Sequence, residues 1–180
     1  SLILIAISCI FMGTGVPTTA TYIILVAVAA PALAQLQIEP IVSHFFVFYY
    51  GVLADITPPV ALAAYAAAGI AGSNPFKTGN TAFRLGIAKA LVPFVFVYSP
   101  SLLLVAQGFD LYIFFETLIS AMIGIALIGV SFAGYWLKTV TLFQRWYLGT
   151  VSLLFIAPGI NSSMIGFFLI LPIIFLQVKK

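Results

Sequence analysis

The stretch Ala54-Asp55-Ile56-Thr57-Pro58-Pro59-Val60 interrupts an apolar segment that covers residues 41–71. Pro58 and Pro59 have no backbone N–H to donate, and each disfavours the α-helical conformation in the residue before it. The apolar segment is therefore predicted to form two half-helices joined by non-helical backbone. We call residues 55–59 the helix break.

The composition indicates a membrane protein. The 180 residues are 63% hydrophobic and 6% charged, with a mean hydropathy of +1.24, whereas soluble domains average about 45–50% and about 25%. Seven basic and four acidic residues cannot cover the surface of a water-soluble protein. We therefore predict an all-α integral membrane protein. The single Cys9 and single His44 argue against a disulfide framework and a histidine-based metal site, and the scattered cations do not form a nucleic-acid-binding surface.

A second interruption lies near the start of the chain, at Gly13-Thr14-Gly15-Val16-Pro17-Thr18-Thr19-Ala20. The apolar run before it would reach only about 18 Å as a helix, which is too short for a hydrocarbon core of about 30 Å. Residues 1–36 are therefore predicted to form a re-entrant helical hairpin, and we call residues 13–19 the hairpin tip. Because the chain starts inside an apolar run and without methionine, we expect it to be a piece of a longer protein.

The remaining segments predict one amphipathic helix and three to four further transmembrane helices. Residues 73–91 begin with the helix-start pair Asn74-Pro75 and carry three cations, which is typical of an interfacial helix. Apolar runs at 90–106 and 111–137 predict two membrane spans. Those at 146–156 and 164–178 are either thin spans or a second re-entrant pair. The predicted parts are a transport-domain half (residues 1–71, with the hairpin at 1–36 and the broken helix at 41–71), an arm (72–91) and C-terminal helices (92–180).

The basic residues orient these segments, because Lys and Arg in short loops favour the cytoplasm. Cations gather at residues 77–89, at 138–145 and at the C-terminus, and even numbers of predicted crossings separate these groups. The three groups are therefore predicted to be cytoplasmic. The loop at Glu39, the turn at residues 107–110 and the loop at Asn161 are predicted to lie outside.

Both interruptions are candidate binding sites, because unwound backbone inside a membrane is tolerated only where protein buries it or where it lines a polar cavity. Carbonyl groups released at a broken helix suit a cation, and half-helix N-termini suit a carboxylate. Thr18, Thr19 and Thr57 would add hydroxyl groups. Asp55 is the one carboxylate well inside an apolar segment, where a charge costs at least about 2.5–3.5 kcal/mol. It needs a cation, a proton or a buried partner.

Two other interpretations of these residues compete with a binding site. In the first, both interruptions are kinks that help pack a helix bundle, and Asp55 caps the half-helix that follows it. In the second, Ser43, His44 and Asp55 supply the residue types of a hydrolytic triad, but no nucleophile elbow accompanies them. We therefore do not expect an enzyme.

The two interruptions, with Ala61-Leu62-Ala63-Ala64-Tyr65 and Ala68-Gly69-Ile70-Ala71-Gly72 downstream of the second, resemble a known family. The chain is similar to the large membrane (permease) subunit of a TRAP transporter, specifically the fused permease of the TAXI type. The resemblance is dense from about residue 12 to residue 100. It implies two inverted repeats, each of which supplies a re-entrant hairpin and a broken helix to an elevator-like transport domain. This chain would be the second repeat with trailing helices, and the first repeat is missing.

The resemblance implies secondary uptake of an organic acid (a carboxylate), driven by an ion gradient and fed by a periplasmic solute-binding protein, in a bacterial or archaeal cytoplasmic (inner) membrane. Carried over to this chain, the ion-binding residues would be Gly13, Gly15, Thr18, Thr19, Asp55, Thr57 and Pro58. The substrate-binding residues would be Pro17, Thr18, Thr19 and Pro59. The family implies Na⁺ as the coupling ion and no other cofactor. The residues themselves leave open proton coupling through Asp55, and a structural or channel-like subunit is the alternative of another class.

Overall fold

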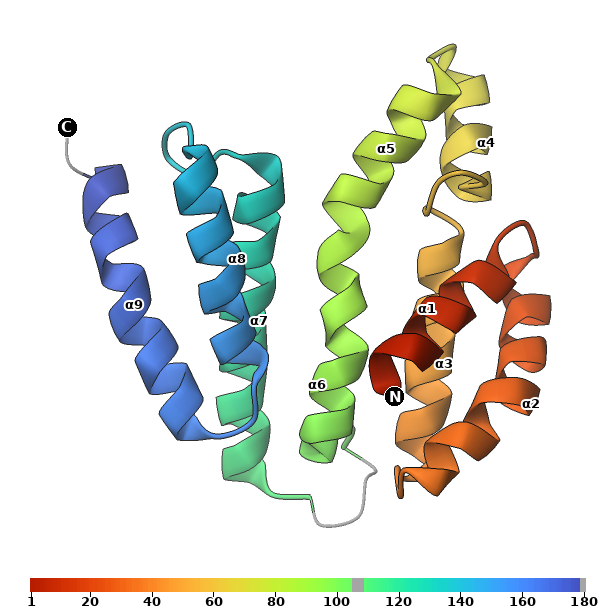
Figure 1. The fold of residues 1–180 in the computed structure, drawn as a ribbon, viewed down its shortest axis with the longest axis horizontal. Helices are drawn as coiled ribbons and strands as arrows, with labels where there is room; N and C mark the ends of the chain where they lie inside the picture. The colour runs from red at the N-terminus through yellow and green to blue at the C-terminus, as the bar shows by residue number, and fades with distance from the viewer. Residues whose placement is uncertain (105–108, 179–180) are drawn as a thin grey trace. The chain divides into compact units, whose positions relative to one another are not determined.

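The computed structural model describes residues 1–104 and 109–178, and within these ranges the chain consists of helices and their connections, without a β-sheet (Figure 1). The chain divides into two compact units, Ser1–Val97 and Tyr98–Lys180. Four helical segments are long and apolar enough to cross a membrane: Thr18–Gln35, Pro75–Tyr98, Leu111–Ala133 and Ile160–Val178. The all-α membrane fold is thereby confirmed. Gln107 and Gly108 of the predicted outer turn, and the basic pair Lys179-Lys180, lie outside the described residues.

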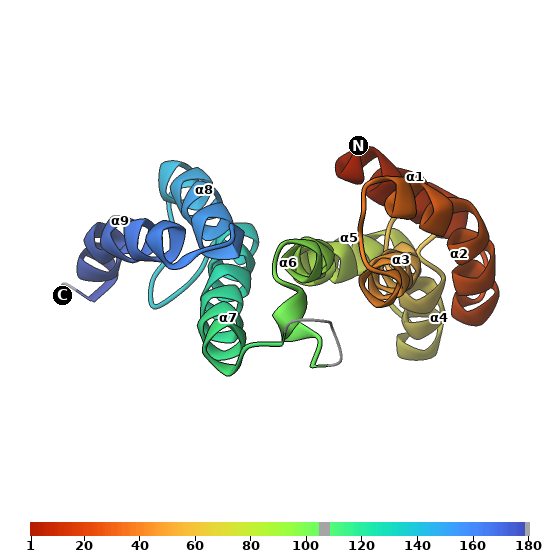
Figure 2. The same cartoon turned by 90° about the horizontal axis from the view of Figure 1, so that it is seen from below.

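The first unit contains the two predicted interruptions as real gaps between helices. Its elements are α1 (Leu2–Gly13), α2 (Thr18–Gln35), α3 (Pro40–Ala54), α4 (Leu62–Ala71), α5 (Pro75–Gly86), the 3₁₀ helix η1 (Ile87–Leu91) and α6 (Val92–Tyr98). Residues 14–17 of the hairpin tip separate α1 from α2, and the helix break separates α3 from α4. Seen from below, α3 lies between the α1–α2 hairpin and α5 (Figure 2).

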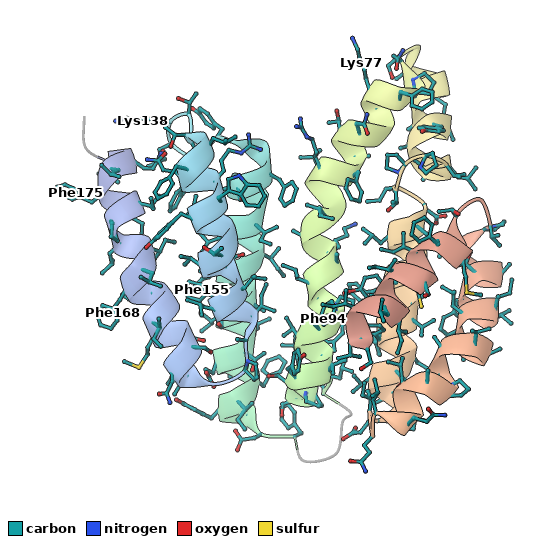
Figure 3. All side chains as sticks on the ribbon, in the orientation of Figure 1. Lys77, Phe94, Lys138, Phe155, Phe168 and Phe175 are labelled. Carbon is teal, nitrogen blue, oxygen red and sulfur yellow. The ribbon has the colours of Figure 1, made fainter. Side chains whose placement is uncertain are left out.

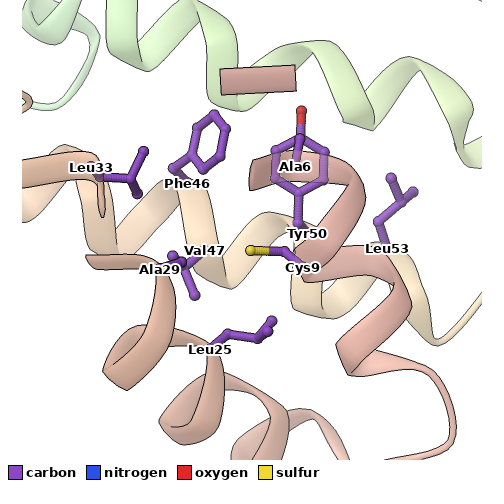
Figure 4. Packing of buried hydrophobic residues seen from close by; sticks show 9 residues of the cluster. All are labelled: Ala6, Cys9, Leu25, Ala29, Leu33, Phe46, Val47, Tyr50 and Leu53. Carbon is purple, nitrogen blue, oxygen red and sulfur yellow. The ribbon is translucent and has the colours of Figure 1, made fainter. Parts of the chain in front are cut away.

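The core of the first unit lies where α1, α2 and α3 meet. Figure 4 shows its buried side chains, which come from all three helices: Ala6, Cys9, Leu25, Ala29, Leu33, Phe46, Val47, Tyr50 and Leu53. Cys9 packs here as a small apolar residue and is 1% exposed. Burial of this cluster fixes the hairpin against α3 and so sets where the hairpin tip lies relative to the helix break.

Helices α5, η1 and α6 continue one another without a turn, and Asn74 caps their start by accepting a hydrogen bond of 3.0 Å from the Lys77 N–H. The boundary predicted near Leu91, between an arm and a separate span, is therefore not a break in the helix. The helix predicted over residues 90–106 ends earlier, because α6 stops at Tyr98 and a 3₁₀ turn (η2, Pro100–Leu102) follows, whereas residues 105 and 106 lie outside the described residues. Whether the basic part of this helix lies in the membrane interface stays a prediction.

The second unit is a bundle of α7 (Leu111–Ala133), α8 (Leu142–Ile156) and α9 (Ile160–Val178). Ser120 and Gly124 on α7 allow close approach to α8: the Ser120 hydroxyl donates a hydrogen bond of 2.5 Å to the carbonyl of Phe155. Phe155 points between α8 and α9 in Figure 3. α8 begins four residues earlier than predicted because Thr141 and Gln144 form a capping box, and α9 likewise extends to Ile160. At 19 residues, α9 is long enough to span; α8, with 15, is not among the four candidate spans.

Candidate ion-binding site at the hairpin tip and the helix break

One hydrogen bond joins the two interruptions. The Thr18 hydroxyl, at the first residue of α2, donates to Asp55 Oδ2 over 2.6 Å, although 37 positions separate the two residues. Asp55 directly follows α3 and is partly buried. A hydrogen bond between a hydroxyl and a carboxylate is among the stronger kinds in proteins. A hydroxyl of the hairpin tip is thus attached to the only carboxylate of the helix break.

The hairpin tip approaches α3 closely through a glycine. A methyl group on Gly13 would lie 2.9 Å from Ala54 Cβ and 2.9 Å from Thr21 Cγ2. Gly15 has a φ of +81°, a conformation that costs glycine little, and a methyl group there would make an ordinary contact of 3.5 Å with Val60 Cγ1. The absence of a side chain at Gly13 lets the hairpin tip lie against the end of α3, whereas Gly15 serves the left-handed backbone of the turn.

Within the helix break the backbone folds back on itself. The Ala63 N–H donates to the Asp55 carbonyl over 3.1 Å, so one N–H in the first turn of α4 is satisfied by backbone of the break. The residue before α4, Ala61, has a left-handed conformation (φ +38°) and no side-chain cap. The Asp55 carboxylate, which the packing interpretation assigned as a cap for α4, accepts from Thr18 instead.

The N-terminus of α2 also has no side-chain cap among the described residues, because Pro17 precedes it. The N–H groups in the first turn of a helix have no intrahelical acceptors and carry a partial positive charge. α2 and α4 therefore both present N-termini at the interruptions, beside the Thr18–Asp55 hydrogen bond. Such termini suit the carboxylate of an organic acid.

The other predicted site residues differ in how they lie. The Thr57 hydroxyl donates to the Leu53 carbonyl over 2.7 Å, one turn back along the chain, so it reinforces the end of α3. Gly15, Pro17 and Thr19 are exposed in this chain. Pro59 is exposed too, and its carbonyl accepts a hydrogen bond of 2.7 Å from the Tyr65 hydroxyl. The structure thus joins Thr18 to Asp55 by a hydrogen bond, whereas the Thr57 hydroxyl bonds to the last turn of α3.

Sequence reasoning assigned no role at this site to Tyr65, and it grouped His44 with Asp55 only in the triad interpretation. Tyr65 binds the helix break through its hydroxyl, and its position one turn into α4 was the available indication. His44 accepts or donates a hydrogen bond of 2.7 Å at Nδ1 with the Tyr22 hydroxyl. Tyr22 lies one turn after Thr18 on α2, so His44 is held by the hairpin rather than by Asp55.

Comparison with protein families identifies the first part of the chain. Residues 1–111 match the family described as "Tripartite ATP-independent periplasmic transporter, DctM component". This range contains the hairpin, the broken helix, α5, η1 and α6, and it ends as α7 begins. Neither a curated protein nor a solved structure matches the chain. The match covers more than half of the chain, and the chain therefore belongs to the DctM family, the large membrane component of the tripartite ATP-independent periplasmic (TRAP) secondary transporters.

Proposed function

We propose that this chain takes part in the ion-gradient-driven uptake of an organic acid by an elevator-type movement, with Na⁺ as the coupling ion. The observation that supports the proposal is the hydrogen bond between Thr18 of the hairpin and Asp55 of the broken helix. It places a carboxylate and a hydroxyl oxygen together beside two helix N-termini that lack side-chain caps. Oxygen ligands of this kind suit a hard cation, and helix N-termini suit an anion.

The proposed order of binding follows from charge. Asp55 alone is costly inside an apolar segment, so a cation at its carboxylate lowers that cost. A cation bound there adds positive charge next to the N-termini of α2 and α4, which favours a carboxylate substrate at the hairpin tip. The negative charge of the substrate in turn offsets the positive charge of the cation. Ion and substrate are therefore expected to bind cooperatively, and neither carries a large net charge across the membrane alone.

Proton coupling is the second candidate, because the group that donates to Asp55 is a neutral hydroxyl and not a lysine or an arginine. A carboxyl group in such a setting can be neutralised by a proton instead of a cation. Uptake of a radiolabelled organic acid by the complete transporter in proteoliposomes distinguishes the two. An imposed Na⁺ gradient at constant pH is expected to drive accumulation. Accumulation driven only by an imposed pH gradient would identify H⁺, not Na⁺, as the coupling ion. Substrate that only equilibrates across the membrane, whichever gradient is imposed, would contradict coupled transport.

We propose further that a periplasmic solute-binding protein delivers the substrate, and that the first repeat of the permease completes the transport domain in a bacterial or archaeal inner membrane. This arrangement requires the predicted orientation. Tyr112, near the start of α7, is 66% exposed, and Leu142, at the start of α8, is 72% exposed. Both belong to the second unit and lie at opposite ends of the α7 span, Tyr112 in its first turn and Leu142 after its last residue.

Cysteine labelling tests this orientation. In intact spheroplasts a membrane-impermeant maleimide is expected to label Tyr112→Cys, whereas Leu142→Cys is expected to be labelled only after permeabilisation. The native Cys9 is 1% exposed, so the parent chain serves as a low-background control. The opposite pattern would invert the orientation.

A further inference from the structure

The helix that follows the broken helix packs along both of its halves. Tyr65 of α4 lies against Gly79 of α5, Ile56 of the helix break lies against Gly86, and Tyr50 of α3 reaches η1. These contacts follow one another in opposite directions along the two segments, so the helix beginning at Pro75 runs antiparallel past α4, the break and α3. All of them lie within the first unit.

The contact at α4 links α5 directly to the backbone of the helix break. A methyl group on Gly79 would lie 2.7 Å from Tyr65 Cε1, so the tyrosine ring fills the space above this glycine. The same ring has Phe76 as a neighbour, with 5.9 Å between the ring centroids. Its hydroxyl donates to the Pro59 carbonyl over 2.7 Å. Tyr65 is therefore held by α5 through its ring and holds the break through its hydroxyl.

At the helix break, the space beside the α5 glycine is even smaller than at Gly79. A methyl group on Gly86 would overlap Ile56 Cδ1, and Gly86 is buried. Ile56 directly follows Asp55 in the chain, and its N–H donates to the Leu53 carbonyl over 3.2 Å. The side chain of Ile56 thus occupies a position that only a glycine on α5 permits.

The contact at α3 is a hydrogen bond to the backbone of the 3₁₀ helix η1. The Tyr50 hydroxyl donates to the Ala90 carbonyl over 2.6 Å, and Tyr50 is 2% exposed. Phe94, labelled in Figure 3, packs on the same helix, with its ring centroid 5.8 Å from that of Phe46. α3 is therefore attached to η1 and α6 by both a hydrogen bond and aromatic packing.

We propose that α5 and η1 form a brace that fixes the two half-helices relative to each other across the helix break, with Ile56 and Tyr65 as positioning residues for the cation site. The helix break lacks the continuous ladder of backbone hydrogen bonds that makes a helix rigid, so packing against a neighbouring helix adds a constraint on its geometry. The brace does so on either side of Asp55. It would then move together with the broken helix as one body. The consequence for cation affinity rests on the proposed function, whereas the mechanical role of the brace does not.

A size exchange between Gly86 and Ile56 tests the brace in the complete transporter. Gly86→Ala is expected to displace Ile56, since overpacking costs enough free energy to change an equilibrium about tenfold. Hydrogen–deuterium exchange of the peptide that covers residues 55–65 should become about tenfold faster, and half-saturating Na⁺ for uptake should rise with little change in maximal rate. Ile56→Val removes Cδ1, so the double variant Gly86→Ala/Ile56→Val is expected to restore both values.

Gly69→Ala is the matched control, because a methyl group there has no neighbour within 4 Å. Tyr65→Phe keeps the ring on Gly79 and removes only the hydroxyl, so it tests the brace even if Gly86→Ala does not fold, and it should also speed exchange at the break. The brace would be overturned if Gly86→Ala and Tyr65→Phe both exchange at the break as slowly as Gly69→Ala. It would also be overturned if the double variant Gly86→Ala/Ile56→Val does not recover the parent exchange rate and half-saturating Na⁺. Uptake without Na⁺ dependence in the parent protein would overturn the proposed function, and the exchange measurements would still decide the brace.

Discussion

Replacing Asp55 by asparagine is expected to raise the half-saturating Na⁺ concentration for uptake at least about tenfold. Interactions with a charged group typically contribute about 1.5–3 kcal/mol, which corresponds to roughly ten- to hundredfold in affinity. Asparagine retains an acceptor oxygen for the Thr18 hydroxyl, which donates to Asp55 over 2.6 Å, so the packing of the hairpin tip is preserved. The measurement is the initial uptake rate as a function of Na⁺ concentration in proteoliposomes.

The pH dependence of the same variant separates the two coupling ions. If Asp55 binds the proton, Asp55→Asn abolishes the pH dependence of uptake and leaves activation by Na⁺ intact. If it binds Na⁺, activation by Na⁺ weakens instead.

Thr18→Val should also weaken Na⁺ activation, whereas Thr18→Ser, which keeps the hydroxyl, should not. The double variant Thr18→Val/Asp55→Asn should show less than the sum of the single effects, because the two side chains share one hydrogen bond. A variant Asp55→Asn with unchanged Na⁺ and pH dependence would remove Asp55 from the site.

Local chemistry explains why the interruptions could be located from the sequence. Proline and glycine restrict or release the backbone at single positions, so the consecutive prolines Pro58-Pro59 and the Gly13-Thr14-Gly15 stretch favour non-helical segments. A single proline does not do so by itself, since Pro31 and Pro172 lie inside α2 and α9. α3 ends at Ala54, directly before the helix break, and α2 starts at Thr18, inside the predicted hairpin tip, whose non-helical part is therefore shorter than predicted. The meeting of the two segments followed from the need to satisfy their polar groups. The pairing of Thr18 with Asp55 depends on how the α1–α2 hairpin packs on α3, which a local pattern does not encode.

The direction of Thr57 was predictable and was missed. Threonine in or near a helix often donates its hydroxyl to the carbonyl four residues earlier, and Thr57 donates to Leu53 in this way. A hydroxyl used like this can still accept from or coordinate another group, but its position is set by α3. The assignment of Thr57 to the ion site therefore stays a prediction that the structure does not strengthen.

The continuous helix beginning at Pro75 was not predicted, because the cations on its exposed face are typical of an interfacial helix. Lys77, Arg84 and Lys89 are exposed, and they favoured an interfacial segment that ends where the apolar run begins. Pro93 lacks the N–H that would bond the Lys89 carbonyl, and the residues before it adopt the tighter 3₁₀ form in η1 without ending the helical segment. The opposite face, with Gly79 and Gly86, carries the contacts to the broken helix.

Gly13→Leu is expected to have the largest effect on the stability of the first unit. Even a single methyl group at this position would meet Ala54 Cβ and Thr21 Cγ2, each at 2.9 Å. Neither neighbour can move away freely: Ala54 ends α3 and is 1% exposed, and Thr21 is also 1% exposed, with its hydroxyl donating to the Val16 carbonyl over 3.0 Å. A leucine must therefore separate the hairpin tip from α3, at a cost of about 3 kcal/mol or more.

The separation should also remove the contact between Thr18 and Asp55, because Thr18 belongs to the hairpin tip, at the start of α2. We expect a lower melting temperature of the purified protein and loss of uptake at Na⁺ concentrations that saturate the parent. Gly69→Leu adds the same side chain at a position with open space around it, so it should melt close to the parent and transport normally. Equal behaviour of the two variants would show that the hairpin tip does not depend on close packing against α3. A Gly13→Leu protein that melts earlier but keeps its Na⁺ activation would instead place the cation away from the contact between the hairpin tip and the helix break.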